Sequence, residues 1–396
     1  MTVVRTKRYL LAEKTIDRDD IDDLIGWLQG YPWLTQGPLV KEFESQWSGW
    51  LGRKYSLFVN SGSSANLLMF YAALLSGRLP NQKVIVPAVS WATTVAPAIQ
   101  LGFEPLLCEA DWTTFGLDLG HLQRLCQEHA PGMVIMVHTL GVPGQMDAIL
   151  ALRERYGFLL LEDCCPAHGS SFEGQHVGTF GDLASFSFYF GHHISTIEGG
   201  IISTDDEQLY DLLLHIRSHG WAKDLDPEKE DRLARSRGVN TFNRPFTFYH
   251  PGFNVRSTDL NARIGLSQMR KIDRVVARRI ENQRVYEERF RGAPGFHYPS
   301  NDRGTTCSIS FVALASSATH RDAIGEVLAK NQIETRPLGG GNMSRQPFWM
   351  DRYGSQAYPV ADAIHQRSFM LPNHPDLTIE DVNFICDTVL AVKPEA

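Results

Sequence analysis

A hydroxyl-rich turn, Asn60-Ser61-Gly62-Ser63-Ser64-Ala65-Asn66, lies directly before an apolar stretch that predicts a helix to about Leu75. The first N–H groups of a helix have no partner within the helix. Together with hydroxyl groups, they can hold a phosphate. Taken alone, the turn fits an ordinary serine N-cap better.

A pair of carboxylates, Glu162 and Asp163, follows the apolar segment Phe158–Leu161, which predicts a strand. The end of a buried strand is where a cofactor partner is expected. Asp163 could pair with a protonated ring nitrogen and keep it charged. It could equally cap a helix or join a buried ion pair, and the pattern alone does not separate these interpretations.

An aromatic run, a histidine pair and a double glycine occupy the segment from Phe186 to Gly200. A lone histidine is usually a core residue with satisfied hydrogen bonds. His192 and His193 are adjacent in a polar turn, so both cannot face the same core. That position weakens the ordinary core interpretation for at least one of them.

An alternation of strands and helices must position these segments. The apolar runs predict strands over 84–86, 106–108, 133–138 and 158–161, and the periodic segments between them predict helices over 91–100, 119–128 and 148–156. Short, nearly all-apolar strands that alternate with helices predict an α/β fold with a mostly parallel sheet sandwiched by helices. Ligands in such sheets bind at the carboxyl ends of the strands.

The ends of the chain predict further elements. Apolar spacing predicts a helix over 16–28 with Asp17 as N-cap, and a long charged helix over 258–290. Strands over 307–314 and 333–336, with helices over 320–330 and 379–392, predict a smaller α+β C-terminal domain. We therefore expect a large domain with the N-terminal segment over 1–275 and a small domain over 276–396.

Composition restricts the class of protein. The 396 residues carry a net charge of −7 without a basic block, so we expect no nucleic-acid partner. The uncharged stretch Val84–Phe103 is long enough to span a bilayer, but its prolines and hydroxyl residues indicate a buried strand, turn and helix. We expect a cytoplasmic protein with no membrane contact. The six cysteines have no metal-ligand spacing, and we expect no metal.

The ordered segments resemble the family of sugar aminotransferases and dehydratases that use pyridoxal or pyridoxamine phosphate. Five more segments carry the likeness over nearly the whole chain: Thr35-Gln36-Gly37-Pro38, Pro87-Ala88-Val89-Ser90-Trp91, Gly252-Phe253-Asn254-Val255-Arg256, Ile333-Glu334-Thr335-Arg336-Pro337 and Leu371-Pro372-Asn373-His374-Pro375. The resemblance implies the fold type I of aspartate aminotransferase. No single segment is decisive, whereas the ordered set is specific.

The resemblance also implies roles for individual residues. Asp163 would hold the pyridine nitrogen, and Trp91 would stack on the ring. The phosphate would be held by Gly62, Ser63, Ser64 and Ser187. Asn254 of the neighbouring subunit would complete this phosphate site, which implies a homodimer. Arg336 and Asn342 would contact the substrate.

Two positions depart from the family pattern. Pro166 stands where the family usually has a side chain that can hydrogen-bond the cofactor's ring hydroxyl. His192 stands where the family has the lysine that binds the cofactor covalently, and no lysine lies between Val84 and Ala222. Imidazole cannot replace that covalent link, but it can accept and donate a proton near neutral pH.

A histidine at this position is typical of the family's 3-dehydratases. One sort carries an iron–sulfur cluster on cysteines beyond the histidine, and this chain has no cysteine between Cys165 and Cys307. The resemblance therefore predicts cluster-free C3 dehydration of a nucleotide-linked 4-keto-6-deoxy sugar, with pyridoxamine phosphate as cofactor and L-glutamate as amino donor. The alternatives are a conventional aminotransferase, a cluster-dependent dehydratase, and a cofactor-binding protein without catalysis.

Overall fold

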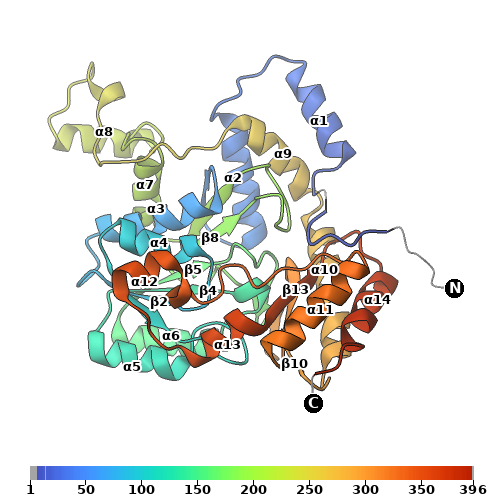
Figure 1. Ribbon diagram of the computed structural model, residues 1–396. Helices are drawn as coiled ribbons and strands as arrows, with labels where there is room; N and C mark the ends of the chain where they lie inside the picture. The colour runs from blue at the N-terminus through green and yellow to red at the C-terminus, as the bar shows by residue number, and fades with distance from the viewer. Residues whose placement is uncertain (1–6, 14, 395–396) are drawn as a thin grey trace.

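The computed structural model describes residues 7–13 and 15–394, and its centre is a seven-stranded sheet (Figure 1). The strand order is β1-β9-β8-β5-β4-β2-β3. The strands are β1 (Tyr55–Val59), β2 (Lys83–Pro87), β3 (Glu104–Cys108), β4 (Met133–Val137), β5 (Leu159–Asp163), β8 (Leu183–Ser187) and β9 (Gly200–Thr204). Only β9 runs antiparallel to its neighbours, so the predicted mostly parallel sheet is confirmed.

Helices cover both faces of this sheet (Figure 1). They are α2 (Pro38–Leu51), α3 (Gly62–Leu75), α4 (Ala92–Gln100), α5 (Leu119–His129), α6 (Met146–Tyr156), α7 (Glu207–Arg217) and α9 (Asp259–Met269). In β2, Val84 and Val86 face the core beneath α3 and α4, whereas Ile85 faces the core beneath α5 and α6. Successive side chains of a strand point to opposite faces, which explains why these strands are apolar throughout.

The C-terminal part contains a second, smaller sheet with its own helices. Its three-stranded sheet has the order β10-β12-β13, made of β10 (Phe296–His297), β12 (Ser310–Ala315) and β13 (Ser368–Pro372). The helices of this part are α10 (Ile272–Phe290), α11 (Ala318–Lys330), α12 (Pro347–Tyr353), α13 (Pro359–Arg367) and α14 (Ile379–Leu390). Trp349 and Ile364 pack into the core of the main sheet, and the division near residue 275 stays a prediction.

Two predicted elements, one helix and one strand, differ from the structure. The helix predicted over 258–290 is broken at Arg270 and Lys271 into α9 and α10, because the chain turns there from the large sheet toward the C-terminal sheet. The strand predicted over 333–336 is a single bridge between Ile333 and Tyr9. The uncharged stretch Val84–Phe103 divides into β2 and α4, and none of the described helices is long and apolar enough to cross a membrane.

The remaining elements lie at the edges. Helix α1 (Arg18–Leu28) begins at Asp17, whose side chain accepts the Asp20 N–H in a capping box, as predicted. Helix α8 (Pro227–Ser236) lies in an arm that projects from the top of the molecule (Figure 1). The short strands β6 (Ser171–Phe172), β7 (Gln175–His176) and β11 (Gly304–Thr305) form a third small sheet.

The start of α2 is fixed by a carboxylate from α9. Asp259 is 2% exposed and accepts the backbone N–H groups of Gly37, Leu39 and Val40. A Cβ atom at Gly37 would lie 2.6 Å from the Asp259 carboxylate, which explains the glycine before Pro38. One buried carboxylate therefore satisfies the free donors of a helix start and joins two helices.

We expect Asp259→Ala to lower the free energy of unfolding by about 1–3 kcal/mol, because it leaves buried N–H groups without an acceptor. Calorimetry at fixed protein concentration measures the change. Asp226→Ala is the matched control, since Asp226 caps the exposed helix α8 through the Glu228 N–H, and its effect should be smaller. Equal losses in both variants would contradict this account of Asp259.

Candidate active site

Asp163 lies at the carboxyl end of β5 and is 3% exposed. One carboxylate oxygen accepts the Asn66 amide at 2.9 Å and the Thr94 hydroxyl at 2.7 Å. The other accepts the Cys165 N–H at 3.1 Å. Three donors from three elements thus fix the direction of this carboxylate.

No basic side chain forms an ion pair with Asp163 in the part of the chain that the structure describes. A buried carboxylate without a cationic partner is costly. A protonated ring nitrogen would supply the missing positive charge. The donor set around Asp163 therefore fits a pyridine cofactor.

The hydroxyl-rich turn forms the start of α3. Ser61 is the N-cap, and its hydroxyl accepts the Ser64 N–H at 3.1 Å, so the capping interpretation is correct for Ser61. The N–H groups of Gly62 and Ser63 have no acceptor within the helix. The exposed Ser63 hydroxyl lies 3.0 Å from the Thr93 hydroxyl at the start of α4. The turn can therefore be capped and still present donors to a phosphate.

Close backbone packing brings Ser187 to this turn. A Cβ atom at Gly62 would lie 2.7 Å from the Ser187 Cβ, and one at Gly200 would lie 2.3 Å from the Ser61 carbonyl carbon. Both positions therefore require glycine. Ser187, at the end of β8, lies beside the helix start, and the structure brings the predicted phosphate residues together.

Trp91 is the N-cap residue of α4, and 60% of its surface is exposed. A loop from the C-terminal part packs beside it. Gly340 has a φ of +81°, and a Cβ there would lie 2.0 Å from the Ser90 carbonyl oxygen. An ideal Cβ on Gly339 would lie 3.3 Å from the Trp91 ring. The indole is thus held at one side and open for a second ring on the other.

The two histidines lie in the loop between β8 and β9 and have different surroundings. His193 is fully buried, and its Nε2 lies 3.0 Å from the Cys307 carbonyl oxygen. His192 is half-buried, and its Nδ1 has no hydrogen-bond partner among the described residues. His193 Nδ1 also lacks a partner, but the His193 ring is fully buried, so the half-buried His192 ring is the one that a reacting group can approach.

Burial, together with the smaller effect of the nearby guanidinium groups of Arg279 and Arg336, lowers the pKa of His192 to about 4. The imidazole is therefore neutral at pH 7 and able to accept a proton. Arg279 is 4% exposed and donates to the His192 carbonyl oxygen at 3.3 Å. No sequence pattern distinguishes Arg279, because it lies inside a charged helix.

The two residues expected to contact the substrate have different surroundings. Arg336 is exposed, and its charge acts on His192, so its guanidinium lies near the reacting position. Asn342 is fully buried; its amide donates to Asp362 at 2.9 Å and accepts the Ser344 N–H at 2.9 Å. Both polar atoms of the Asn342 side chain therefore already have hydrogen-bond partners within the C-terminal part.

Asn254 is exposed in a segment that runs along the outer edge of the sheet. It forms a bridge with Ser218, and the neighbouring Val255 accepts the Asn60 N–H at 2.9 Å. The segment is thus tied to the start of the phosphate turn, while the Asn254 side chain points outward. This placement allows Asn254 to reach a second subunit.

Sequence reasoning missed Thr94 and the role of Asn66. Asn66 was part of the recognised turn, but its contact with Asp163 joins positions that are 97 residues apart. The Asn66 amide oxygen also accepts the Ser185 hydroxyl at 2.6 Å, so both ends of the amide are used. The sequence pattern that could have indicated this role is a polar asparagine one turn into an otherwise apolar helix.

A second group of possible ligands, His138, Glu162 and Cys164, is buried near Asp163. Glu162 already accepts His138 Nε2 at 3.0 Å and the N–H groups of Gly178, Phe180 and Gly181. Burial raises the pKa of the Cys164 thiol well above its ordinary value. The contacts of Glu162 satisfy its carboxylate without a metal.

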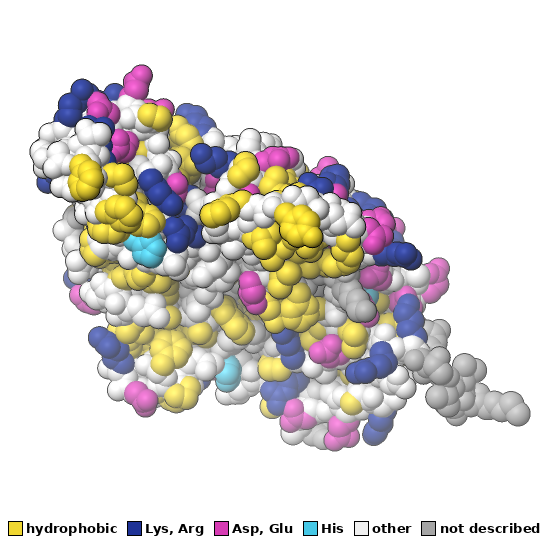
Figure 2. Space-filling model, turned by 90° about the horizontal axis from the view of Figure 1, so that it is seen from above, with side chains coloured by type: hydrophobic (Ala, Val, Ile, Leu, Met, Phe, Trp, Pro, Cys, Tyr) yellow, Lys and Arg dark blue, Asp and Glu magenta, His cyan; other side chains and the backbone are white. Residues whose placement is uncertain are grey.

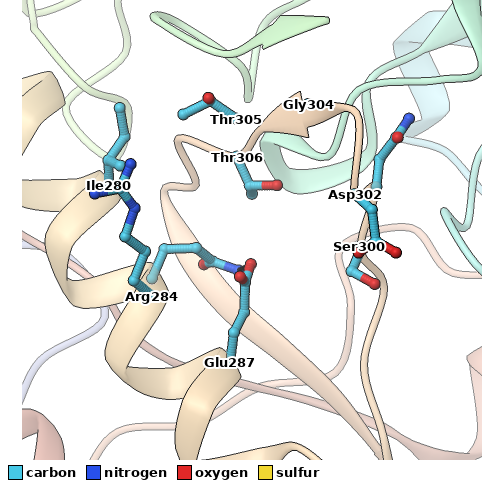
Figure 3. A pocket seen from close by; sticks show the side chains of 10 residues that line it. Ile280, Arg284, Glu287, Ser300, Asp302, Gly304, Thr305 and Thr306 are labelled. Atoms are coloured by element: carbon cyan, nitrogen blue, oxygen red, sulfur yellow. Dashed lines mark hydrogen bonds between the residues drawn. The ribbon is translucent and has the colours of Figure 1, made fainter. Parts of the chain in front are cut away.

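A polar cavity of about 210 Å³ lies between α10 and the segment 300–306 (Figure 3). Figure 3 shows the Glu287 side chain pointing from the helix toward Thr306, whereas the Arg284 side chain runs along the helix toward Ile280. None of the site residues described above lines this cavity. The chemistry of the carboxyl strand ends therefore lies elsewhere.

The mostly parallel sheet, with a buried unpaired carboxylate, a hydroxyl-rich helix start and an exposed indole at its carboxyl ends, is that of a fold type I pyridoxal-phosphate enzyme. The chain belongs to the DegT/DnrJ/EryC1/StrS aminotransferase family, whose pattern matches residues 14–390.

Similar proteins include a GDP-4-keto-6-deoxy-D-mannose 3-dehydratase of Yersinia pseudotuberculosis, 36% identical over 315 residues, which are 78% of this chain and 79% of that protein. The solved Escherichia coli GDP-4-keto-6-deoxy-D-mannose-3-dehydratase with bound hydrated PLP has a TM-score of 0.89 and 30% identity, covering 97% of this chain and 100% of that one. A GDP-4-keto-6-deoxymannose-3-dehydratase structure with a trapped PLP-glutamate geminal diamine has a TM-score of 0.88 and 29% identity, covering 96% and 100%.

We expect acid to destabilise the fold through its buried histidines. Burial lowers the pKa of His168 and His193 well below 6.5, whereas the unfolded chain binds protons at that ordinary value. The unfolded state therefore takes up more protons below pH 6.5, and each histidine costs roughly 1.4 kcal/mol per pH unit there. Above pH 6.5 neither residue contributes a slope.

The measurement is the free energy of unfolding against pH for the parent chain, His168→Leu and His193→Asn. Below pH 6.5, the slope of the unfolding free energy against pH should fall in each variant by the contribution of about one bound proton. An unchanged slope in both variants would show that these rings are already protonated in the folded protein.

Proposed function

We propose that this chain is a pyridoxamine-phosphate-dependent 3-dehydratase of a nucleotide-linked 4-keto-6-deoxy sugar, with L-glutamate as amino donor. The observation that carries the proposal is a half-buried histidine, His192, at the position of the family's lysine, in a chain that keeps a buried carboxylate without a cationic partner at Asp163. The dehydratase relatives described above support this substrate class.

The proposed cofactor residues form a site in three parts. Asp163 would hold a proton on the ring nitrogen, since its carboxylate has donors but no cationic partner. Trp91 would cover one face of the ring. Gly62, Ser63, Ser64 and Ser187 would bind the phosphate, with Asn254 of the neighbouring subunit. When bound, pyridoxamine phosphate supplies an amine for the substrate's ketone and a conjugated ring that accepts electrons.

His192 would move the protons of the reaction. As a neutral imidazole, it can accept a proton from the C4′ carbon of the cofactor and then deliver a proton to the departing C3 hydroxyl. The C3 oxygen leaves as water, and two electrons from glutamate replace it with hydrogen. The products are the 3-deoxy ketone, 2-oxoglutarate and ammonia. Arg336 would contact an anionic group of the substrate or the donor.

The missing lysine favours elimination over transfer of the amine. An aminotransferase uses that lysine to hold the cofactor covalently and to move the proton. His192 can perform only the second task. A protein without catalysis is the second candidate, and retention of Asp163, Trp91 and the phosphate turn argues against it.

We propose that the active form is a homodimer. Large apolar side chains are exposed on α1 and after it, where Ile21 is 43%, Tyr31 95% and Trp33 73% exposed. On the arm that carries α8, Phe242 is 92% exposed. Figure 2 shows hydrophobic side chains gathered on the face that carries α1 and α8. Apolar surface of this extent is typical of an interface.

We expect His192→Asn to retain the cofactor and to lose roughly 10²–10⁴-fold in turnover, because only the base is removed. His192→Lys should bind the cofactor covalently and lose dehydration. Release of the deoxygenated sugar, followed by mass spectrometry, measures both effects. Borohydride should leave a reduced adduct on the His192→Lys protein only.

Two results would contradict this assignment. An adduct on any lysine of the unchanged chain would show that another residue replaces the family's lysine. Near-normal turnover of His192→Asn would assign proton transfer to a different group.

We expect complementation between Asp163→Asn and Asn254→Ala subunits. If Asn254 acts across the dimer, a mixed dimer has one site with both wild-type residues and one with neither. Two differently tagged subunits, expressed together, should pair at random and regain about a quarter of wild-type turnover. If Asn254 acts within its own subunit, every site carries one defect and the mixture stays as inactive as its parents.

A further inference from the structure

We infer that His168 and His193 form a buried positioning unit, which fixes the loop carrying His192 and thereby the direction of the His192 ring. The inference rests on the proposed role of His192 in proton transfer. It assigns no contact with substrate to either residue.

The three imidazole rings lie nearly parallel. His168 and His193 have ring centres 4.7 Å apart with planes at 22°, and His168 and His192 have centres 6.2 Å apart with planes at 14°. His168 follows Asp163 by five residues and is fully buried. Its ring is enclosed edge-to-face by three aromatic side chains, those of Trp47, Phe186 and Phe188.

His193 joins this stack to the rest of the fold. Its Nε2 lies 3.0 Å from the Cys307 carbonyl oxygen, so Nε2 carries the proton and donates. The same Cys307 donates its N–H to the Ser170 hydroxyl at 3.0 Å. The ring of His193 is thus fixed by a carbonyl that precedes β12 and by the face of His168.

The loop is held at two further points. Arg279 donates to the His192 carbonyl oxygen at 3.3 Å and to the Ile309 carbonyl oxygen at 3.1 Å. The Thr15 hydroxyl donates to the Phe190 carbonyl oxygen at 2.7 Å. The backbone beside His192 is therefore held on both sides. The packing of His193 against His168 adds a further constraint on the loop.

A buried histidine at position 168 lowers the stability of the fold compared with an apolar residue of similar size. Neither nitrogen of His168 has a hydrogen bond of good geometry among the described residues, although the backbone of Ser187 lies within reach of a weak one. A buried polar group without a partner costs about 1–3 kcal/mol. A leucine would fill the aromatic enclosure without that cost. Burial also keeps the pKa of both rings low, so the unit adds no positive charge beside His192.

The test is a double-mutant cycle on the half-reaction with glutamate. Purified protein loaded with pyridoxal phosphate is mixed with L-glutamate, without nucleotide sugar, and conversion to the pyridoxamine form is followed by absorbance. We expect His168→Leu to slow this conversion by roughly 10–100-fold, as misplacement of a reacting group does. The dissociation constant of the cofactor should change by less than about twofold, since its proposed anchors are untouched.

The second arm repeats His168→Leu in the His192→Asn background. A positioning residue acts through His192, so we expect no further loss there. His320→Leu is the matched control: His320 is a buried histidine of the C-terminal part that hydrogen-bonds Ser316 and the Val392 carbonyl oxygen. It should reduce stability and leave the rate of conversion unchanged. His193→Asn repeats the cycle if His168→Leu does not fold.

Three results would overturn the inference: an unchanged rate in His168→Leu, the same loss in both backgrounds, or a loss fully explained by weaker cofactor binding. A different result reports on the proposed function. If the unchanged protein does not convert the cofactor, or if His192→Asn converts it at the normal rate, the role of His192 itself is wrong.

Discussion

The buried carboxylate of Asp163 is the constraint on which the site depends. Three donors hold it, and each comes from a different element: Asn66 from α3, Thr94 from α4, and the Cys165 N–H from the turn after β5. The same contacts that orient the carboxylate therefore fix the two helix starts around it. Since none of these donors carries a charge, the carboxylate has no cationic partner among the described residues, and a cationic ring would supply one.

The positions of the hydroxyl-rich turn at residues 60–66 and of the exposed Trp91 indole follow from this arrangement. Asn66 lies one turn beyond Gly62 in α3, so fixing Asn66 against Asp163 also fixes the free N–H groups at the helix start. Thr94 does the same for Trp91 at the start of α4. Glycine at positions 62 and 200 then allows β8 and β9 to approach the turn closely enough for Ser187 to join it.

The reacting position depends on the C-terminal part as well as the sheet. Arg279 from α10 contacts the loop of His192, and the charge of Arg336 acts on the same imidazole. The pKa of His192 is thus lowered by burial and by two cations from beyond residue 275. A lysine at this position would meet the same cations and burial, both of which favour its neutral amine, so the loop suits a neutral base of either kind.

The sequence by itself determined the strands β2, β3, β4 and β5, the helices between them and the chemical types at the strand ends, because hydrophobic periodicity and the order of short segments are local properties. It did not predict β1, β8 or β9, which complete the sheet. It also determined that His192 stands without a lysine nearby. Only the tertiary structure decided that Asn66 and Thr94 hold Asp163, that Asn342 faces inward, and that Arg279 reaches the loop. It also showed that the predicted helix over 258–290 is broken and that 333–336 is not a strand. These outcomes depend on contacts between distant positions, such as the 97 residues between Asn66 and Asp163, and no local pattern encodes such a distance.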